Sequence, residues 1–307
     1  LNDVVSMREC CTRFPDVFSP DERKFYAMTK AMNDAGVPVD REFALLATAE
    51  AERFKAQYKA QGAKAGAQQA AFIAEFSGEG QKELSISSQQ ALLSFLTTYG
   101  VSLPNAQGAT IETFLASATA AECPPVVAEV LGLRLKANKA ATSKYKSILA
   151  GANLDSRCRG TISFYGAART GRDAGRRIQP QNLARPVMVG ADSPRRVFED
   201  MEVAVEFVEN GGLDTIDEPL TLLSDCVRGV IAAPDGKKFC QADLSNIEGR
   251  VCPWLAGEQW KLDYFSAFDR GDIPFDNYVM AYAKSFGVSP ESVTKPQRAI
   301  GKVMELA

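Results

Sequence analysis

Apolar residues recur at helical spacing through most of the first 150 positions of the chain. Helices are predicted over these stretches: 21–35, 40–62, 87–100, 110–118 and 124–150. Gly36 and Pro38 are a typical stop for the first helix, and Asp40 can cap the start of the second. The part of the chain between residues 21 and 150 is therefore expected to be entirely α-helical.

The pattern changes near residue 159. The stretch "RGTISFYG" (159–166) is rich in β-branched and aromatic residues and predicts a strand, whereas the following "AARTGRDAGRRIQPQNLARP" predicts a loop with little strand. Helices are expected over 194–210 and 220–230, a strand over "KKFCQADL" (237–244), and helices from there to the end. The order favours an α+β protein, mixed α/β in its second half.

Composition excludes several classes of protein. The chain has 307 residues, 46% hydrophobic and 24% charged, as in ordinary globular proteins, and it is long enough for two or three structural units. No apolar stretch is long enough to span a membrane, so no membrane partner is expected. The absence of His removes Ser-His and Cys-His nucleophiles and disfavours a zinc site. Seven Cys without a C-x-x-C pair favour a reduced, cytoplasmic setting, the cytoplasm of the host cell if the protein is viral.

Positive charge is concentrated in one block. Between Arg134 and Pro186 the sequence has twelve Lys or Arg and two Asp, a local net charge of +10, although the whole chain has a net charge of −3. The other 254 residues therefore carry −13. Such a block predicts a surface for a polyanion, and a solvated cationic face is the alternative.

Two carboxylates stand close together at a predicted strand-to-helix junction. In "QADLSNIEGR", Asp243 ends the predicted strand and Glu248 lies in the first turn of the next helix. Ser245 and Glu248 also fit an S-x-x-E capping box, so Glu248 could simply cap the helix and Asp243 could be an ordinary turn residue.

Two cations lie at the start of the last helix. In "TKPQRAIGKVMELA", Thr294 and Gln297 fit another capping box, and Arg298 and Lys302 follow at i, i+4 on one face. A phosphate chain between them would relieve their repulsion and use the free N–H groups of the helix start. Two solvated surface charges are the alternative.

A third candidate is the Gly- and Arg-rich stretch "GAARTGRDAGRRIQPQN". Glycines allow a close approach of backbone to a ligand, and Arg suits phosphate. Gln179, Gln181 and Asn182 carry amides of the kind that contact the minor groove. A flexible surface loop is the alternative.

Together these motifs resemble family A (DNA polymerase I-like) DNA polymerases of the phage type. "ADLSNIEGRVCPWLAGE" is similar to their first catalytic-carboxylate motif, and "RAIGKVMELA" to the start of their nucleotide-binding fingers helix. "RTGR…QPQNLARP" is similar to the primer-template segment of their palm, and "MNDAGVPVD" to the sequence before their thumb. The resemblance covers nearly the whole chain in the order of the family.

The resemblance implies an α-helical thumb, a palm with an antiparallel sheet and the beginning of the fingers. The implied boundaries are 1–20 for the tail of a preceding 3′–5′ exonuclease-like domain or a linker, 21–150 for the helix leading to the palm and the thumb, 151–258 for the palm, and 259–307 for partial fingers. The chain is thus expected to be part of a longer protein.

The implied activity is addition of dNTPs to the 3′-OH of a primer on template DNA, with two Mg²⁺ ions in the complete enzyme. Asp243 and the Leu244 carbonyl would bind metal, Glu248 would select deoxynucleotides, and Arg298 and Lys302 would bind the triphosphate, with Lys302 also protonating pyrophosphate. The implied DNA contacts are Lys139, Lys144, Lys146, Arg169, Thr170, Gly171, Arg172, Gln179, Gln181 and Asn182.

The sequence also departs from the family pattern. Leu244 replaces a common aromatic residue, Ala184 a common Pro, and Ala168 a His of phage-like members. The Tyr-Gly that ends the fingers motif and the later His-Asp-Glu motif are absent. We therefore expect the chain alone to bind primer-template DNA without extending it. A non-catalytic DNA-binding module is the main alternative, and an α-helical structural protein with chance motifs is a further one.

Overall fold

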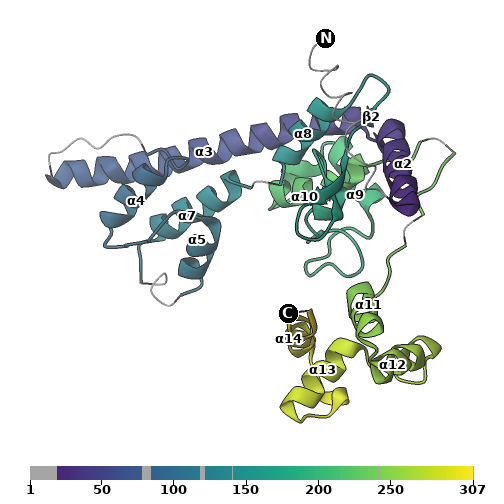
Figure 1. Cartoon of the computed structure of the whole chain (residues 1–307). Helices are drawn as coiled ribbons and strands as arrows, with labels where there is room; N and C mark the ends of the chain where they lie inside the picture. Colours follow the sequence, from purple (N-terminus) through teal and green to yellow (C-terminus); the bar gives the residue numbers. More distant parts are fainter. Residues whose placement is uncertain are drawn as a thin grey trace, which may run out of the picture. The chain divides into compact units, whose positions relative to one another are not determined.

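The computed structural model of the chain describes residues 19–77, 84–117, 122–139, 141–234, 236–240 and 242–306. The chain forms two compact units, residues 1–238 and 239–307. Both consist mainly of helices, and the strands belong to small antiparallel sheets, so the predicted α+β class is confirmed (Figure 1). Within the described ranges, every helix is too short or too polar to cross a membrane.

The starts of the first two described helices agree with the sequence prediction. Helix α2 (Pro20–Ala35) begins at Ser19, which forms a capping box with Glu22, and it ends at Gly36. Helix α3 (Arg41–Ser77) follows the short strand β1 (Val37–Pro38), and Asp40 caps it by accepting from the Phe43 N–H at 2.9 Å. Helix α3 extends well beyond the predicted end at residue 62.

Two glycines inside α3 allow another segment of the chain to pack closely against this helix. A Cβ at Gly62 would lie 2.6 Å from the Ile86 side chain, and one at Gly66 would lie 2.5 Å from Leu84. Both glycines therefore leave room for the segment around Leu84 and Ile86 to pack directly on the helix. Ile86 is 1% exposed, so this contact belongs to the core.

The remaining helices of the predicted α-helical part are short. They are α4 (Gln89–Thr97), α5 (Gly108–Leu115), α7 (Pro125–Ala137) and α8 (Ser143–Gly151). The prediction of one continuous helix over 124–150 is wrong, because α7 ends at Asn138 and α8 begins after Thr142. Asn and Thr compete for backbone hydrogen bonds and favour helix ends, and Thr142 Oγ1 indeed donates to the Lys139 carbonyl at 3.2 Å.

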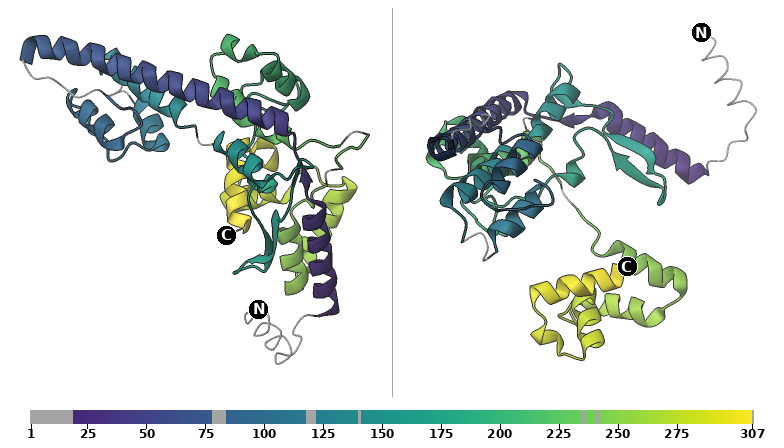
Figure 2. Two further views of the ribbon diagram at one scale, coloured as in Figure 1. Left: turned by 90° about the horizontal axis from the view of Figure 1, so that it is seen from above. Right: turned by 90° about the vertical axis from the view of Figure 1, so that its left-hand side faces the viewer.

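Strands of the first unit form two ribbons. Strands β1 and β2 (Arg157–Cys158) pair antiparallel, with Val37 opposite Cys158. Strands β3 (Ile162–Ala167) and β4 (Arg172–Gly175) form a hairpin, with Ile162 opposite Gly175. The sequence predicted β3 but assigned the region of β4 to a loop. Figure 2 shows the hairpin running alongside α2.

After the hairpin the chain forms mostly short helices. They are η1 (Pro180–Asn182), α9 (Met201–Glu209), η2 (Gly212–Thr215), α10 (Pro219–Asp225) and η3 (Cys226–Val230). The predicted helix over 194–210 begins only at Met201, because Asp200 is its N-cap and accepts from the Val203 N–H at 3.0 Å. Residues from α3, α7, α8 and α10 share one apolar core.

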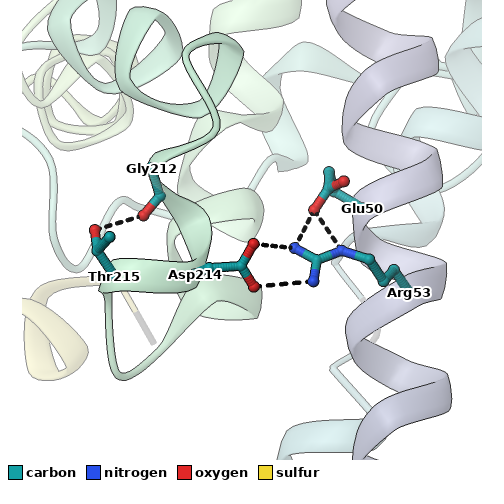
Figure 3. Close-up of polar contacts among 5 residues, drawn as sticks. All are labelled: Glu50, Arg53, Gly212, Asp214 and Thr215. Carbon is teal, nitrogen blue, oxygen red and sulfur yellow. Dashed lines mark hydrogen bonds and ion pairs between the residues drawn. The ribbon is translucent and has the colours of Figure 1, made fainter.

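Arg53 links α3 to the turn at η2. Its guanidinium donates to both carboxylate oxygens of Asp214, at 2.9 and 3.0 Å, and to Glu50 on its own helix (Figure 3). Asp214 lies 161 positions further along the chain, so the contact ties the long helix to the second half of the unit. All three side chains are partly exposed, and the pairs are expected to stabilise the fold by about 1 kcal/mol at most.

The second unit contains four helices and one short turn in its described part. They are α11 (Ile247–Ala256), α12 (Gln259–Arg270), α13 (Asn277–Phe286), η4 (Pro290–Ser292) and α14 (Lys295–Leu306). Lys261 and Glu305 form an ion pair between α12 and α14. Gly301 allows α14 to approach α13 closely, since a Cβ there would lie 2.1 Å from the Tyr278 carbonyl oxygen.

The strand predicted over 237–244 is absent from the described part of this stretch. Residues 237–240 and 242–244 have no regular secondary structure, although a strand was predicted over "KKFCQADL". A strand requires hydrogen bonds to a neighbouring strand, and no described segment pairs with this one. The local sequence alone therefore did not determine whether this stretch forms a strand.

Candidate nucleotide and nucleic-acid sites

Asp243 lies in the non-helical segment that precedes α11. Its side chain is exposed, and Leu244 beside it is 71% exposed. Among the described residues, no group of three or more acidic, Cys or His side chains is placed to bind a metal ion. The structure thus offers one exposed carboxylate and one adjacent carbonyl here, which could be only part of the ligand set of a hard cation such as Mg²⁺.

The turn after Asp243 is fixed by Arg250. Its Nε donates to the Ser245 carbonyl at 2.9 Å, and its two Nη atoms donate to Asp269 of α12, each at 2.7 Å. The guanidinium also lies 4.6 Å from the centroid of the Phe265 ring. Hydrogen bonding from Arg250 holds the pKa of Asp269 below its usual range. The Arg of the D-x-S-x-I-E-x-R pattern therefore holds the turn in place.

Helix α11 begins one residue later than the capping box predicted. Asn246, not Ser245, is the N-cap, with a left-handed backbone (φ +52°) and no capping hydrogen bond from its side chain. Its Oδ1 instead accepts from the Tyr278 hydroxyl at 3.0 Å. Gly249 makes room for this amide, because a Cβ there would lie 2.6 Å from it. Glu248 is exposed in the first turn of the helix.

Both cations of α14 lie near the same tyrosine. The Arg298 guanidinium carbon is 5.2 Å from the centroid of the Tyr278 ring, and Lys302 Nζ is 5.9 Å from it. Arg298 also forms an ion pair with Asp276, with Nε donating at 2.7 Å. Neither of the two sequence alternatives included this pairing. Among the described residues, Lys302 lies over the same ring but forms no ion pair.

A small cavity of about 60 Å³ opens at this place. Its lining includes Ser245, Asn246, Tyr278 and Arg298. Asn277 also lines it, and the buried Nδ2 of this residue has no hydrogen-bond partner in the described structure. Space and an available donor suit a water molecule or a small polar group of a ligand.

Two residues of this site, Tyr278 and Asp276, were not predicted from the sequence. Asp276 caps α13 by accepting from the Val279 N–H at 3.0 Å, and the same carboxylate pairs with Arg298. The cap itself was readable as D-x-x-V before an apolar run, but the ion pair depends on the packing of α13 against α14. The hydrogen bond between Tyr278 and Asn246 likewise spans 32 positions and has no local signal.

In the first unit, the tip of the β3–β4 hairpin presents the predicted Arg and Gly residues. Arg169 and Thr170 are exposed, and Arg172 begins strand β4. Gly171 has φ +65°, and a Cβ there would lie 3.0 Å from the Tyr165 ring. The tip is therefore a tight turn that needs glycine at position 171.

Helix α2 anchors this hairpin. The Tyr165 hydroxyl donates to Glu22 at 2.9 Å, and the Thr29 hydroxyl donates to Asp173 at 2.9 Å. Asn33 makes two hydrogen bonds to the backbone of Ile162, at 2.8 and 2.9 Å. Hydrogen bonds around Ser19 are the main cause of a lowered pKa of Glu22, and the Tyr165 hydroxyl adds to them.

The amide-bearing segment follows the hairpin. Gln179 has a left-handed backbone (φ +41°), and its side-chain carbonyl accepts from the Asn182 amide at 2.9 Å. Tyr165 and Arg177 share this backbone region (φ +52° and +58°). Left-handed non-glycine residues are strained and tend to cluster at functional sites, so this run supports a role for the segment. The side chain of Gln181 lies outside the described part.

The three candidate lysines differ in their surroundings. Lys139 Nζ donates to the Thr221 hydroxyl at 2.8 Å and lines a cavity of about 600 Å³ between α5, α7 and α10. Lys146 forms an ion pair with Glu52 of α3, and hydrogen bonding from the lysine lowers the pKa of Glu52. Lys144 is partly exposed. Part of the basic block therefore also holds the fold together.

The chain was compared with family models, with curated proteins and with solved structures. No family model matches the chain. The chain is 32% identical over 296 residues to a DNA polymerase of Bacillus phage SP02, a match that covers 93% of this chain and 40% of that protein. It therefore spans about two fifths of the length of this relative.

A solved structure has a similar fold. It is the POL domain of Pol1 from M. smegmatis in complex with DNA primer-template and dNTP, with a TM-score of 0.51, 17% identity, and coverage of 89% of this chain and 39% of that one. At this identity the likeness concerns the fold alone.

Proposed function

We propose that this chain acts in DNA-directed DNA synthesis as a relative of the family A DNA polymerases, which is supported by its homology to a phage DNA polymerase and by a fold similar to that of a Pol1 polymerase domain. Its partners in this proposal are primer-template DNA and dNTPs. The function of the two units follows: residues 1–238 bind DNA, and residues 239–307 bind the nucleotide. The finer division at residues 150 and 258 into thumb, palm and partial fingers is part of the same proposal.

One observation carries the nucleotide site. Two motifs about 50 positions apart meet at Tyr278, which donates to Asn246 beside the Asp243 motif and lies next to Arg298 and Lys302. A site for a nucleoside triphosphate needs cations for the phosphates and oxygen ligands for a metal ion, and this unit offers both kinds of group.

The roles of the side chains follow from their chemistry. Asp243 and the Leu244 carbonyl are exposed oxygen ligands, and Lys302 is the cation available to a phosphate group. Arg298 must exchange its contact with Asp276 before it binds phosphate, so we expect it to contribute less than Lys302. Lys302 is also the proposed proton donor to pyrophosphate, and Glu248 is proposed to disfavour a ribose 2′-OH.

A divalent cation, for which we expect Mg²⁺, neutralises the charge of the phosphates when it is bound. Mg²⁺ is usually held by one or two carboxylates together with substrate phosphates and water. Asp243 therefore fits as one ligand that acts in company with a bound triphosphate, and a second ion would need further carboxylates than the motif supplies.

The DNA-binding role rests on the hairpin tip and the segment after it. Arg169, Thr170, Gly171 and Arg172 form the tight turn at the hairpin tip. Gln179, which has a left-handed backbone, follows with Gln181 and Asn182. Cations at such a turn suit phosphates, and amides suit base edges in the minor groove. Lys139, Lys144 and Lys146 extend the cationic surface along α7 and α8.

Binding experiments with the 307-residue chain test the proposal. Fluorescence anisotropy should detect binding of a primer-template duplex, and a labelled dNTP should bind more tightly with Mg²⁺ than without. Asp243→Ala should remove the Mg²⁺ effect and leave DNA binding unchanged, whereas Lys302→Ala should weaken dNTP binding with or without the ion. Asp272→Ala, an exposed carboxylate of the same unit that pairs with Arg270, is the matched control.

The outcomes separate the candidate functions. Binding of DNA without any binding of dNTP would favour the non-catalytic DNA-binding module. Failure to bind DNA would refute the role of the first unit. Primer extension should be absent in Mg²⁺ and in Mn²⁺, and robust extension would mean that a second catalytic carboxylate lies within this chain and that the roles assigned to Asp243 must be redrawn.

A further inference from the structure

Two polar side chains near the end of the first unit, the buried Asp225 and the partly buried Arg228, hold the backbone that follows the amide-bearing segment. Asp225, at the end of α10, is 1% exposed, and its Oδ2 accepts from the N–H groups of Val187 and Met188 at 2.8 and 2.6 Å. Both donors belong to consecutive residues, so one carboxylate oxygen fixes the direction of the chain at this point.

Arg228 of η3 donates hydrogen bonds to backbone carbonyl groups of the same segment. Its Nε donates to the Ala184 carbonyl at 3.0 Å, and its Nη2 donates to the Leu183 carbonyl at 2.7 Å. Together the two side chains bind four backbone groups within residues 183–188, donors and acceptors alike. A segment without regular secondary structure is thus held in one conformation by side chains from outside it.

The held segment connects directly to the candidate DNA contacts. The Leu183 N–H donates to the Pro180 carbonyl at 3.3 Å, and the Asn182 N–H donates to the Gln179 carbonyl at 2.9 Å. Leu183 is therefore bonded on one side to the turn that carries Gln179 and Asn182, and on the other side to Arg228. A shift of Leu183 would move that turn.

Residues 219–230, which form α10 and η3, also contact the region of the candidate lysines. Thr221 of α10 accepts from Lys139, and the Leu223 carbonyl accepts from the buried Tyr145 hydroxyl of α8 at 2.6 Å. Residues 219–230 thereby contact both the amide-bearing segment and the helices that carry the candidate lysines.

Stability of the core alone does not require a buried carboxylate at this position. Burying a carboxylate is costly unless hydrogen bonds compensate for the lost hydration, and apolar residues of similar size usually stabilise a core at least as well. Burial indeed raises the pKa of Asp225, although the two N–H donors oppose that shift. Polar networks of this kind fix one specific conformation, which is what a binding segment requires.

We propose that Asp225 and Arg228 are positioning residues, which set the backbone of residues 183–188 and thereby present the turn at 179–182 to primer-template DNA. The proposal rests on the DNA-binding role proposed above for the first unit. Neither side chain needs to contact DNA, and the effect of each is transmitted through the backbone that it binds.

Charge makes the test sharp for Asp225. Asp225→Leu removes a negative charge from a DNA-binding unit, which on electrostatic grounds alone should tighten DNA binding. It also removes the oxygen that accepts both N–H groups, so a positioning role predicts the opposite, a loss of affinity by about tenfold, which is about 1.4 kcal/mol. The matched control is Asp217→Leu, which removes an exposed carboxylate just before α10.

The salt dependence of binding makes the test equally sharp for Arg228. If Arg228 acts by position, Arg228→Gln should lower the affinity while the slope of log K against log[salt] stays the same. If it contacts a phosphate, the slope should fall by about 0.9. Arg196→Gln, a change at a surface arginine paired with Glu199, is the control for general charge effects.

Hydrogen exchange keeps the test decisive if a variant is destabilised. In the wild-type chain the amides of Val187 and Met188 should be protected, and Asp225→Leu should expose them while α3 stays protected. Arg228→Lys, which keeps the charge, is the second variant if Arg228→Gln does not fold, and it should lose affinity at an unchanged salt slope.

The outcomes distinguish this proposal from the proposed function. DNA binding by the wild-type chain together with unchanged or tighter binding by Asp225→Leu would overturn the positioning role alone. A reduced salt slope in Arg228→Gln would overturn it for Arg228 and make that residue a phosphate contact. No DNA binding by the wild-type chain would refute the proposed DNA-binding role itself.

Discussion

Lys139 can have two roles: it can stabilise the fold through a hydrogen bond, and it can bind a DNA phosphate. Its ammonium donates to the Thr221 hydroxyl at 2.8 Å, and that hydroxyl in turn donates to Glu218 at 2.7 Å. Lys139 lies where α7 ends, so this hydrogen bond ties α7 to α10. Lys139→Gln removes the charge and alters the tie, whereas Thr221→Val removes the tie and keeps the charge.

The two substitutions should differ in their effect on salt dependence. A phosphate contact contributes about 0.9 to the slope of log K against log[salt], so each lost contact changes the salt-induced loss of affinity by about 3.5-fold between 50 and 200 mM salt. The affinity ratio of wild type to Lys139→Gln should therefore shrink by about 3.5-fold over this range. Thr221→Val should leave the slope unchanged.

Both substitutions should lower the free energy of unfolding. Thr221→Val removes, and Lys139→Gln weakens, a partly buried hydrogen bond from a charged donor, and such bonds contribute about 1.5 kcal/mol or somewhat more. Urea unfolding followed by circular dichroism measures this term, and anisotropy titrations with a primer-template duplex at several KCl concentrations measure the slope. An unchanged slope in Lys139→Gln would show that Lys139 only supports the fold, and a changed slope in Thr221→Val would refute the separation of the two roles.

Three further predictions follow from single features of the structure. Tyr145→Phe should lower the free energy of unfolding by about 1 to 2 kcal/mol, because it leaves the buried Leu223 carbonyl without its phenol donor; a loss below about 0.3 kcal/mol in urea unfolding would contradict this. Glu248→Ala should raise the affinity for ribonucleotides relative to deoxynucleotides in competition binding, and an unchanged ratio would leave Glu248 as an ordinary residue of the helix start. In the native chain, iodoacetamide should modify the exposed thiols of Cys240 and Cys252 faster than the buried thiols of Cys158 and Cys226, as measured by mass spectrometry. Burial raises the pKa of both buried thiols, that of Cys226 to about 12, and so disfavours the reactive thiolate. Equal rates at the exposed and buried positions would contradict the fold.

Elements with a complete local signal were predictable from the sequence. Helix α2 was predicted almost to its ends, since Ser19 and Glu22 form a capping box at the start and Gly36 ends the helix. Asp40 caps α3 as expected, and at the start of α14 the Gln297 side chain accepts from the Thr294 N–H at 2.8 Å. In each case the deciding contact lies within four residues of the position that it decides.

The candidate site was predictable only as a set of residue types. The motifs around Asp243 and Arg298 were identified together with the resemblance to family A polymerases, and that resemblance is confirmed. The pairing of Arg298 with Asp276 and the position of Tyr278 between the two motifs were not predicted. Their partners lie more than 20 positions away, beyond the reach of periodicity or capping rules.

The sequence by itself determined the α+β class, most helix starts and the residues that give the chain its chemistry, because capping, periodicity and charge are local properties. Tertiary structure decided which of these residues remain free for a ligand. It paired Lys146 with Glu52, and it used Asp225 and Arg228 to hold a loop. It also decided that residues 237–240 and 242–244 form no strand, because a strand is completed by hydrogen bonds to a distant segment and not by its own composition.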